Sequence, residues 1–357
     1  MAKNTYDESS FKVLRGLEPV RQRPGMYTNL ESPNHLIAEV VDNACDEALA
    51  GYAKNIYVTA HSDGSVSVQD DGRGIPVGLH PEEGISVVEV AFTVLHSGGK
   101  FDKESGGAYK FAGGLHGVGV AVTNALSTKV EVTVYRDGGE HFVRFMNGVA
   151  HAPLARIGDC AKKRSGTTVR AWPDAKYFDA PNVILPQLER SLRSKAVLLP
   201  GTSITLHLEK TGETKSWTYP DGLRGYLTEA MAEQELAVPI FAMEKYVPAG
   251  SDSGYAEGEG AAWAMVWSAE GPVARESYVN LIPTWAGGTH DSGLKDGAFN
   301  AIKNFAELHG MLPKGVKLVS DDVFTRMSFV LSAKVLDPQF QGQTKDKLVS
   351  RDALRLV

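Results

Sequence analysis

The pattern of apolar residues near the N-terminus predicts an amphipathic helix over residues 35–50. Ser32-Pro33-Asn34, a combination that often starts a helix, lies just before it. On a helical wheel the apolar residues form one stripe, as in a helix that packs one face on a core. The stripe consists of Ile37, Val40, Val41, Ala44 and Ala48.

Helical spacing recurs in four later segments, and alternating apolar residues predict strands between them. The helical segments are Ser86–His96, Val120–Leu126, Leu185–Val197 and Gly293–Leu308. The strands are Lys54–Ala60, Ser65–Asp70, Lys129–Arg136, His141–Phe145, Thr167–Trp172, Ser203–Leu208, Ala262–Trp267 and Ser277–Ile282. Turn residues at Ser62-Asp63-Gly64 and Asp137-Gly138-Gly139 predict two hairpins, and Ala249–Gly260 is expected to be a surface loop.

The order of these elements predicts an α+β fold. Up to about residue 215 the elements fit a layer sandwich, with a sheet on one side and helices on the other. We expect residues 1–15 to be an N-terminal arm, residues 16–218 the first domain and residues 219–357 a smaller α+β second domain. Tyr219-Pro220-Asp221-Gly222 is the expected boundary.

Composition places the chain among ordinary globular proteins. Its 357 residues are 43% hydrophobic and 22% charged, and the net charge of −6 argues against a chain that is mainly a nucleic-acid-binding surface. Two cysteines, Cys45 and Cys160, form no disulfide framework. The N-terminal segment lacks the apolar stretch of a secretion signal and no later run is long enough for a membrane span, so we expect a cytoplasmic protein.

The polar face of the helix at 35–50 suggests chemistry. Glu39 and Asn43 are one helical turn apart, roughly opposite the apolar stripe, with His35 beside them. A solvated polar face is the simpler reading. In a cleft, however, the carboxylate would polarise water and the amide oxygen would suit Mg²⁺.

Asp70 ends a predicted strand on the same side as Val66 and Val68, where an unpaired carboxylate would be costly. Asp71-Gly72 supplies an ordinary turn without involving Asp70. The functional alternative is that Asp70 accepts a hydrogen bond from an amine such as that of adenine. Gly72-Arg73-Gly74 would let the backbone approach a planar ring, with Ile75 and Pro76 as an apolar wall.

Glycines crowd between Gly98 and Gly119 and run into the start of a predicted helix. No Lys-Ser/Thr pair follows, so this is not a P-loop, and the spacing is not the dinucleotide fingerprint. A flexible loop is one reading. Because Lys100, Lys110 and His116 bring positive charge to bare amides, a phosphate lid is the other.

Two later positions carry weaker signals. Thr167, at the start of a strand, could hydrogen-bond a base, although threonine is common in strands for its β-propensity alone. Lys345, in the segment Gln343–Lys347, could reach a phosphate, although a lysine near the end of a chain is usually solvated.

Together these residues resemble the Bergerat-type (GHKL) ATP-binding fold of gyrase-like topoisomerases, heat-shock protein 90, histidine kinases and MutL. The motif order is E-x-x-x-N, D-x-G-x-G, G-x-x-G-x-G and G-T on a strand. Within that superfamily the chain is similar to the B subunits of bacterial type IIA topoisomerases. The similarity is carried by EVVDNACDEALAG, QDDGRGIP, GGLHGVG, QTKDKL, HPEEG, ESYVNLIPTWAGGTH and GLEPVRQRPGMY.

The sequence between these motifs, at Pro33–Leu36 and Asp337–Phe340, is more similar to the topoisomerase IV B subunit than to gyrase B. The resemblance implies a Bergerat-fold domain followed by a transducer domain like domain 2 of ribosomal protein S5. It also implies an ATP-driven clamp that dimerises, captures double-stranded DNA and acts with a topoisomerase IV A subunit in decatenation and relaxation. Aminocoumarin-type and other ATP-site inhibitors are expected to bind.

The resemblance implies roles for individual residues at the catalytic end of the site. Glu39 would be the general base, with His35 orienting the attacking water, and Asn43 would ligate Mg²⁺. Asp70 would bind the adenine amine, aided by Thr167.

Further residues are implied to hold ATP. Tyr109 would lie near the adenine, with Arg73 stacked over it and paired with Glu47. Lys345, with Gln343 beside it, would reach the γ-phosphate, and Tyr6 of the arm would cross to the partner's site. Lys100 would hold the phosphates together with the amides of Gly113, Gly114, Leu115, His116, Gly117, Val118 and Gly119.

Some features depart from the family pattern. Extra glycines lengthen the stretch Asp102–Ala108, and Ala112 stands where serine is common. The chain ends at Val357, soon after QTKDKL, so the second domain is expected to be truncated at its C-terminal end. The chain has no E-G-D-S-A motif to bind the metal that DNA cleavage needs, and in this family the tyrosine that cleaves DNA belongs to another subunit. We therefore expect this chain to hydrolyse ATP without cutting DNA.

Other members of the superfamily fit less well. A histidine kinase would lack the domain that carries Lys345, and a chaperone or mismatch-repair ATPase would lack ESYVNLIPTWAGGTH. A protein that binds nucleotide only for structure would not need Glu39.

Overall fold

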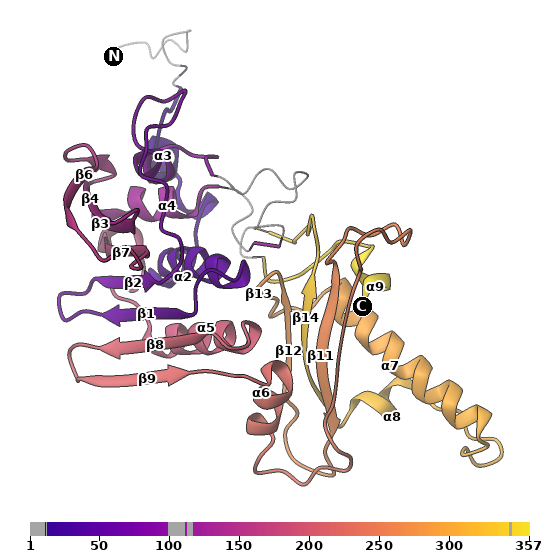
Figure 1. The fold of residues 1–357 in the computed structure, drawn as a ribbon. Coiled ribbons are helices and arrows are strands. Elements are labelled where there is room, and N and C mark those ends of the chain that lie inside the picture. The colour runs from indigo at the N-terminus through magenta and orange to yellow at the C-terminus, as the bar shows by residue number, and fades with distance from the viewer. Residues whose placement is uncertain (1–10, 12, 99–110, 113–116, 343–344) are drawn as a thin grey trace, which may run out of the picture.

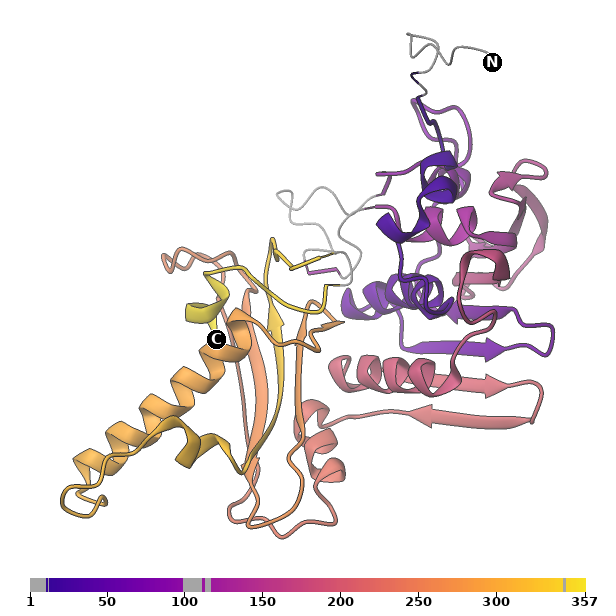
Figure 2. The same cartoon turned by 180° about the vertical axis from the view of Figure 1, so that it is seen from behind.

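The computed structural model describes residues 11, 13–98, 111–112, 117–342 and 345–357. The described chain forms two sheets, each covered by helices, and Figures 1 and 2 show them side by side. The predicted α+β class is confirmed. The predicted boundary near residue 219 falls between the last strand of one sheet and the first helix of the other, but the domain limits stay a prediction.

The first sheet contains nine strands in the described chain, in the order β5-β4-β3-β7-β2-β1-β8-β9, with β6 beside β4. Neighbouring strands are antiparallel except β1 and β8, which are parallel. The bounds are β1 Asn55–Ala60, β2 Val66–Asp70, β3 Ser127–Arg136, β4 Gly139–Met146, β5 Val149–Ala150, β6 Ala155–Asp159, β7 Gly166–Pro173, β8 Ser203–Leu208 and β9 Glu213–Trp217.

Helices cover this sheet because their apolar stripes complete its core. Val41 and Ala44 of α2 and Leu192 of α5 are buried together with Val58, Val132 and other strand residues. The predicted stripe is therefore the buried face of α2, except that Ala48 lies at its edge and is only partly buried. The helices are α1 Glu18–Gln22, η2 Pro24–Met26, α2 Asn34–Leu49, α3 Val87–Thr93, α4 Gly119–Ala125, η3 Ala175–Tyr177 and α5 Leu185–Leu198.

The second sheet has the order β10-β11-β14-β12-β13, with β12 and β14 parallel. Helix α7 packs on one face through Leu294, which is buried with Phe329 and Leu331. Leu227 of α6 is buried in the same cluster as residues of the first sheet, so one core runs through both parts. The elements are α6 Gly222–Ala230, β10 Phe241–Tyr246, β11 Gly260–Trp267, β12 Arg275–Val279, β13 Ile282–Pro283, α7 Thr289–Leu308, α8 Ser320–Phe324, β14 Met327–Lys334 and α9 Ala353–Leu356.

The expectation of one continuous strand over Ser277–Ile282 is wrong. Asn280 and Leu281 both have positive φ, at 49° and 66°, and form a two-residue turn between β12 and β13. The Asn280 side chain holds this turn against the end of β14. Its Nδ2 donates to the Val335 carbonyl at 2.6 Å, and its Oδ1 accepts from the Val335 amide at 2.9 Å.

Other predicted bounds also differ from the structure. The helix expected over Ser86–His96 ends at Thr93, and the one expected from Gly293 begins at Thr289. The loop expected over Ala249–Gly260 ends in buried residues, because Glu259 accepts hydrogen bonds from Ala256 and Leu336 while Gly260 starts β11. Among the described residues, no helix is both long and apolar enough to cross a membrane.

Asn280→Ala should destabilise the chain by about 2–4 kcal/mol. The change leaves two buried backbone groups of Val335 without partners and places alanine at a positive φ. Urea unfolding followed by tryptophan fluorescence measures the loss. Asn147→Ala is the matched control, because Asn147 also has positive φ but is exposed, and it should cost less than about 1 kcal/mol. Equal losses in the two variants would contradict the role of the Asn280 side chain.

Candidate functional site

A cavity of about 440 Å³ lies over the polar face of α2. Its walls come from α2, the loop after β2, the start of α4 and the strand β7, and one residue of the second sheet's half of the chain also lines it. The predicted site residues that line this cavity are His35, Glu39, Asn43, Glu47, Asp70, Arg73, Gly74, Ile75, Pro76, Gly117, Val118, Gly119, Thr167 and Lys345.

The polar face of α2 presents its groups in an ordered row. His35 Nδ1 lies 3.0 Å from the Thr28 hydroxyl, while His35 Nε2 lies 3.7 Å from Glu39 Oε1. Asn43 Nδ2 donates to the Glu39 carbonyl at 2.9 Å, which fixes the orientation of the amide. The ring, the carboxylate and the amide are therefore held next to one another at the cavity wall.

Asp70 lies where surrounding atoms remove most of its hydration. This desolvation, aided by the charge of Glu47, raises the pKa of the Asp70 carboxyl to about 7, although the Gly72 amide donates to Oδ1 at 2.9 Å and opposes the rise. Thr167 lines the cavity too, and its hydroxyl accepts from the Ile75 amide at 3.2 Å. The Asp70 carboxyl could therefore accept a strong hydrogen bond from a donor group on a bound ligand.

Arg73 and Glu47 form a bidentate ion pair at the cavity edge. Arg73 Nη2 lies 2.8 Å from Glu47 Oε1, and Arg73 Nε and the Arg73 amide both donate to Oε2. The guanidinium also lies over the ring of Tyr52, 3.7 Å from its centroid. These contacts hold the loop after β2 against α2.

Gly119 brings the first turn of α4 close to Glu39. A Cβ at this position would lie 2.0 Å from Glu39 Oε2, so no larger residue fits while the carboxylate keeps its place. The predicted helix therefore begins at the cavity, with Gly117 and Val118 leading into it.

Lys345 reaches the cavity from the second half of the chain. Backbone hydrogen bonds anchor the residues after it, because the Ala286 amide donates to the Asp346 carbonyl and Leu348 pairs with Gly287 and Gly288. Gly288 allows this close approach, since a Cβ there would lie 2.4 Å from the Leu348 carbonyl oxygen. Two regions far apart in sequence thus share one site.

Some predicted site residues lie outside the described residues. They are Tyr6, Lys100, Tyr109, Gly113, Gly114, Leu115, His116 and Gln343. The same holds for most of the 1–15 arm and for the long stretch 102–108. Their roles stay predictions.

Several residues at the site had no sequence prediction. Thr28 contacts His35, Tyr52 stacks under Arg73, and Tyr27 lines the cavity. Arg136 also lines it and donates to the Gly74 carbonyl at 2.7 Å. A local signal could not have identified Thr28, Tyr52 or Arg136, since each contacts a residue that belongs to a different element or loop.

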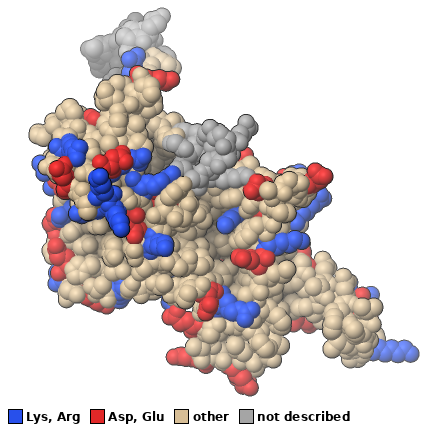
Figure 3. All heavy atoms as spheres, viewed as in Figure 1, with Lys and Arg blue, Asp and Glu red and all other residues tan. Residues whose placement is uncertain are grey.

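The surface shows no comparable concentration of charge on the face seen in Figure 3. There, basic and acidic side chains of the described residues are intermixed over both halves of the molecule.

Two family models match the chain. Residues 28–176 match the histidine kinase-, DNA gyrase B- and HSP90-like ATPases, and residues 222–357 match DNA gyrase B. A solved structure of the topoisomerase IV ATP-binding domain of Francisella tularensis, in complex with a small-molecule inhibitor, is 40% identical. It covers 96% of this chain and 88% of that one, with a TM-score of 0.75. The chain belongs to the topoisomerase IV and gyrase B family.

Two further relatives agree with this family. The B subunit of DNA topoisomerase 4 from Pseudomonas aeruginosa is 49% identical over 356 residues, which are 99% of this chain and 54% of the relative. The 43K ATPase domain of Thermus thermophilus gyrase B, in complex with an aminocoumarin, is 31% identical, with a TM-score of 0.77, and covers 95% of this chain and 86% of that one. The chain thus spans about half the length of its curated topoisomerase 4 relatives. The predicted resemblance to the topoisomerase IV B subunit is confirmed.

Asp70→Asn should remove a pH dependence of stability. The folded pKa of about 7 lies above the ordinary value of 3.8, so between these values the native state holds a proton that the unfolded state has released. The free energy of unfolding therefore falls as pH rises from about 4 to about 7, by roughly 4 kcal/mol, and the neutral variant lacks this fall. Urea unfolding at a series of pH values measures it.

Asp71→Asn is the matched control. Burial raises the pKa of Asp71, but hydrogen bonds from Asn55 and Lys54 outweigh that and lower it. Its stabilising effect is therefore complete above the ordinary pKa and is lost only as pH falls below about 4. An Asp70→Asn curve that runs parallel to the wild type between pH 4 and 7 would contradict the raised pKa.

Proposed function

We propose that the cavity binds ATP with Mg²⁺ and hydrolyses it, and that the chain is the ATP-operated clamp of a topoisomerase IV B subunit. The observation that carries this proposal is that Lys345 lines the same cavity as Glu39, Asn43 and Asp70. A cavity lined by an acid, an amide and a distant lysine suits a substrate with a base at one end and phosphates at the other.

In the proposed complex, Asp70 accepts a hydrogen bond from the adenine amine. Its ionised form is the better acceptor, so binding of the amine would compensate for the desolvation of the carboxylate. Thr167 would act beside it, and Ile75 and Pro76 would contact the ring. Arg73 would cover the base from its position on Glu47 and Tyr52, and Tyr109 would lie near it.

Glu39 is the proposed general base. A carboxylate within reach of a cavity water can accept its proton as the water attacks the γ-phosphate. His35, held through Nδ1 by the Thr28 hydroxyl, would orient that water from Nε2. As in other phosphoryl transfers, positioning and charge neutralisation would supply most of the rate.

The residues present fit a magnesium ion that is shared with the nucleotide. Mg²⁺ prefers oxygen ligands and is commonly bound by one or two protein groups together with substrate phosphates. Asn43 turns its Nδ2 to the helix backbone, and its Oδ1 is the oxygen that would bind the cation. Among the described residues, no group of three or more His, Cys, Asp or Glu side chains is placed to hold a metal ion. The ion would neutralise phosphate charge.

Lys345 is proposed to contact the γ-phosphate, with Gln343 beside it, while Lys100 and the amides of residues 113–119 hold the remaining phosphates. When the γ-phosphate leaves, Lys345 would lose this contact, and the transducer domain at 219–357 would move as a result of hydrolysis. The arm at 1–15, with Tyr6, would cross to a second copy, so that ATP closes a homodimer around double-stranded DNA.

The whole protein is proposed to work in the cytoplasm with a topoisomerase IV A subunit in decatenation and relaxation, and to bind ATP-site inhibitors. The inhibitor-bound relatives support the last point. A gyrase B role is the second candidate, favoured by the DNA gyrase B match over residues 222–357. Two measurements distinguish these candidates. One is which cleavage subunit the full-length protein binds, and the other is whether the resulting complex supercoils or decatenates DNA.

Glu39→Gln should abolish turnover while leaving ATP binding nearly intact. We expect kcat to fall by about 100-fold or more, because the general base is lost, and ATP affinity to change by less than about threefold. Steady-state ATPase assays and calorimetry with a non-hydrolysable analogue measure the two. Glu31→Gln, at an exposed acid outside the cavity, is the control and should behave as wild type. Wild-type turnover in Glu39→Gln would remove Glu39 as the base.

The ATPase rate per chain should rise with protein concentration, because the proposed active species is a dimer. Removal of residues 1–15 should make total activity linear in concentration and lower it. The assay is ATP turnover over about a hundredfold range of concentration, at fixed saturating ATP and Mg²⁺. Linear, Mg²⁺-independent turnover by the intact chain would contradict the proposal.

A further inference from the structure

A buried ion pair joins α2 to α5 next to the cavity. Lys195 Nζ of α5 lies 2.6 Å from Oδ1 of Asp42, the residue before Asn43. Burial alone would lower the pKa of Lys195, but the charge and hydrogen bond of Asp42 together with other nearby acidic groups outweigh burial and raise it. Among the described residues, no hydrogen-bond donor other than this ammonium lies at the buried Asp42 Oδ1.

The same ammonium reaches into the second half of the chain. Lys195 Nζ donates to the Leu281 carbonyl at 2.5 Å, in the turn between β12 and β13. Its neighbour Asn280 holds both backbone groups of Val335, the residue that follows β14. Val335 begins the segment that ends at Lys345. A short path of direct contacts thus leads from the polar face of α2 to the segment that carries Lys345.

The turn at this junction is strained. Leu281 has a φ of 66°, which costs a residue with a Cβ roughly 1–2 kcal/mol. Such strain persists only where the surrounding structure holds it, and it occurs often at functional positions. The hydrogen bond from Lys195 to Leu281 and the two hydrogen bonds of the Asn280 side chain hold this strained turn in place.

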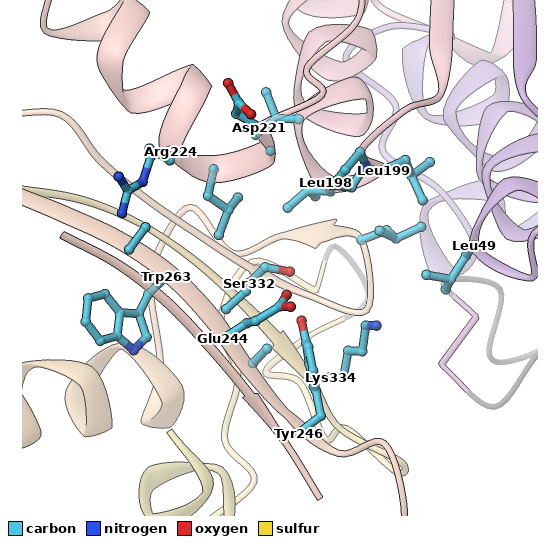
Figure 4. A pocket seen from close by; sticks show the side chains of 18 of the residues that line it. Leu49, Leu198, Leu199, Asp221, Arg224, Glu244, Tyr246, Trp263, Ser332 and Lys334 are labelled. Atoms are coloured by element: carbon cyan, nitrogen blue, oxygen red, sulfur yellow. The ribbon is translucent and has the colours of Figure 1, made fainter. Parts of the chain in front are cut away.

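A cavity of about 680 Å³ lies beside this contact, between the two halves of the chain. In Figure 4, Leu49 and Leu198 lie on one side of it, and Glu244, Tyr246 and Lys334 of the second sheet lie on the other. Leu281 and Asn280 line it as well. At the edge of this space α5 bonds to the second half of the chain through Lys195 and Leu281 and through Ser194 and Tyr278, beside the core that both halves share.

We propose that Lys195 is a positioning residue for ATP hydrolysis, which holds the Lys345 segment at the correct distance from the Glu39–Asn43 face of α2. This inference rests on the proposed function, because it assigns Lys195 an effect that acts through Lys345.

Steady-state ATPase kinetics of the 357-residue chain test the inference. Lys195→Met should lower kcat by about 10-fold or more while changing KM for ATP by less than about threefold, because it displaces a catalytic group without touching the adenine site. Lys215→Met is the matched control, since it breaks a Lys–Glu pair that joins β9 to Glu189 of the same helix, at 2.9 Å, away from the junction. It should leave kcat and KM unchanged.

Two further variants separate positioning from stability. Lys195→Met leaves a buried carboxylate unpaired and should lower Tm, whereas Lys195→Met combined with Asp42→Asn should regain Tm but keep the low kcat. In a double-mutant cycle, Lys195→Met added to Lys345→Ala should cause little further loss, because both changes remove the same effect.

The outcomes distinguish the inference from the proposed function. If Lys345→Ala is slow but Lys195→Met turns over as fast as wild type, the inference is wrong and the proposed function stands. Losses that multiply in the double variant, or a kcat that recovers together with Tm, also overturn it. If Lys345→Ala itself has wild-type kcat, the proposed role of Lys345 fails and the inference fails with it.

Discussion

Glu39, Asp42 and Glu47 of α2 face other side chains or the cavity, and the arrangement of the elements around them follows from this constraint. Buried carboxylates are costly unless they are paired. Glu39 lies beside His35 of the same helix, Asp42 pairs with Lys195 of α5, and Glu47 pairs with Arg73 after β2. Lys195 and Arg73 come from other elements, so their pairs with Asp42 and Glu47 also hold α5 and the loop after β2 against α2.

This constraint also explains how one helix serves both chemistry and coupling. The apolar stripe of α2 fixes the helix on the sheet, which leaves its polar face as a rigid wall of the cavity. Groups held in place by the fold need no rearrangement when charge develops, which is the main advantage of a preorganised site. Lys195 pairs with Asp42 of this helix and donates a hydrogen bond to the Leu281 carbonyl. These contacts connect α2 to the turn that precedes β13, and through Asn280 to the segment that carries Lys345.

Local patterns in the sequence predicted many elements of the first sheet and of the helices that cover it. The period of the α2 stripe separated Glu39 and Asn43 from the core face, and strand parity placed Asp70 beside buried valines, because both depend only on neighbouring residues. The family's motifs then brought Lys345 to the same site. The family and the α+β fold class agree with the known relatives.

Contacts between distant segments were not predictable in this way. Nothing near Lys195 indicates that its partners are Asp42 and Leu281, and Tyr52 gives no local sign that Arg73 stacks on it. The turn at Asn280–Leu281 was missed because it contains no glycine and interrupts an apolar run. β14 is almost entirely buried, so it lacks the alternation that identifies a half-exposed strand.

The most direct test of the central claim is a crystal structure of this chain with a non-hydrolysable ATP analogue and Mg²⁺. The account predicts that the adenine amine bonds to Asp70, that the metal is bound by Asn43 Oδ1, and that Lys345 Nζ contacts the γ-phosphate. A nucleotide bound elsewhere, or one bound in this cavity with Lys345 turned away from its phosphates, would contradict it.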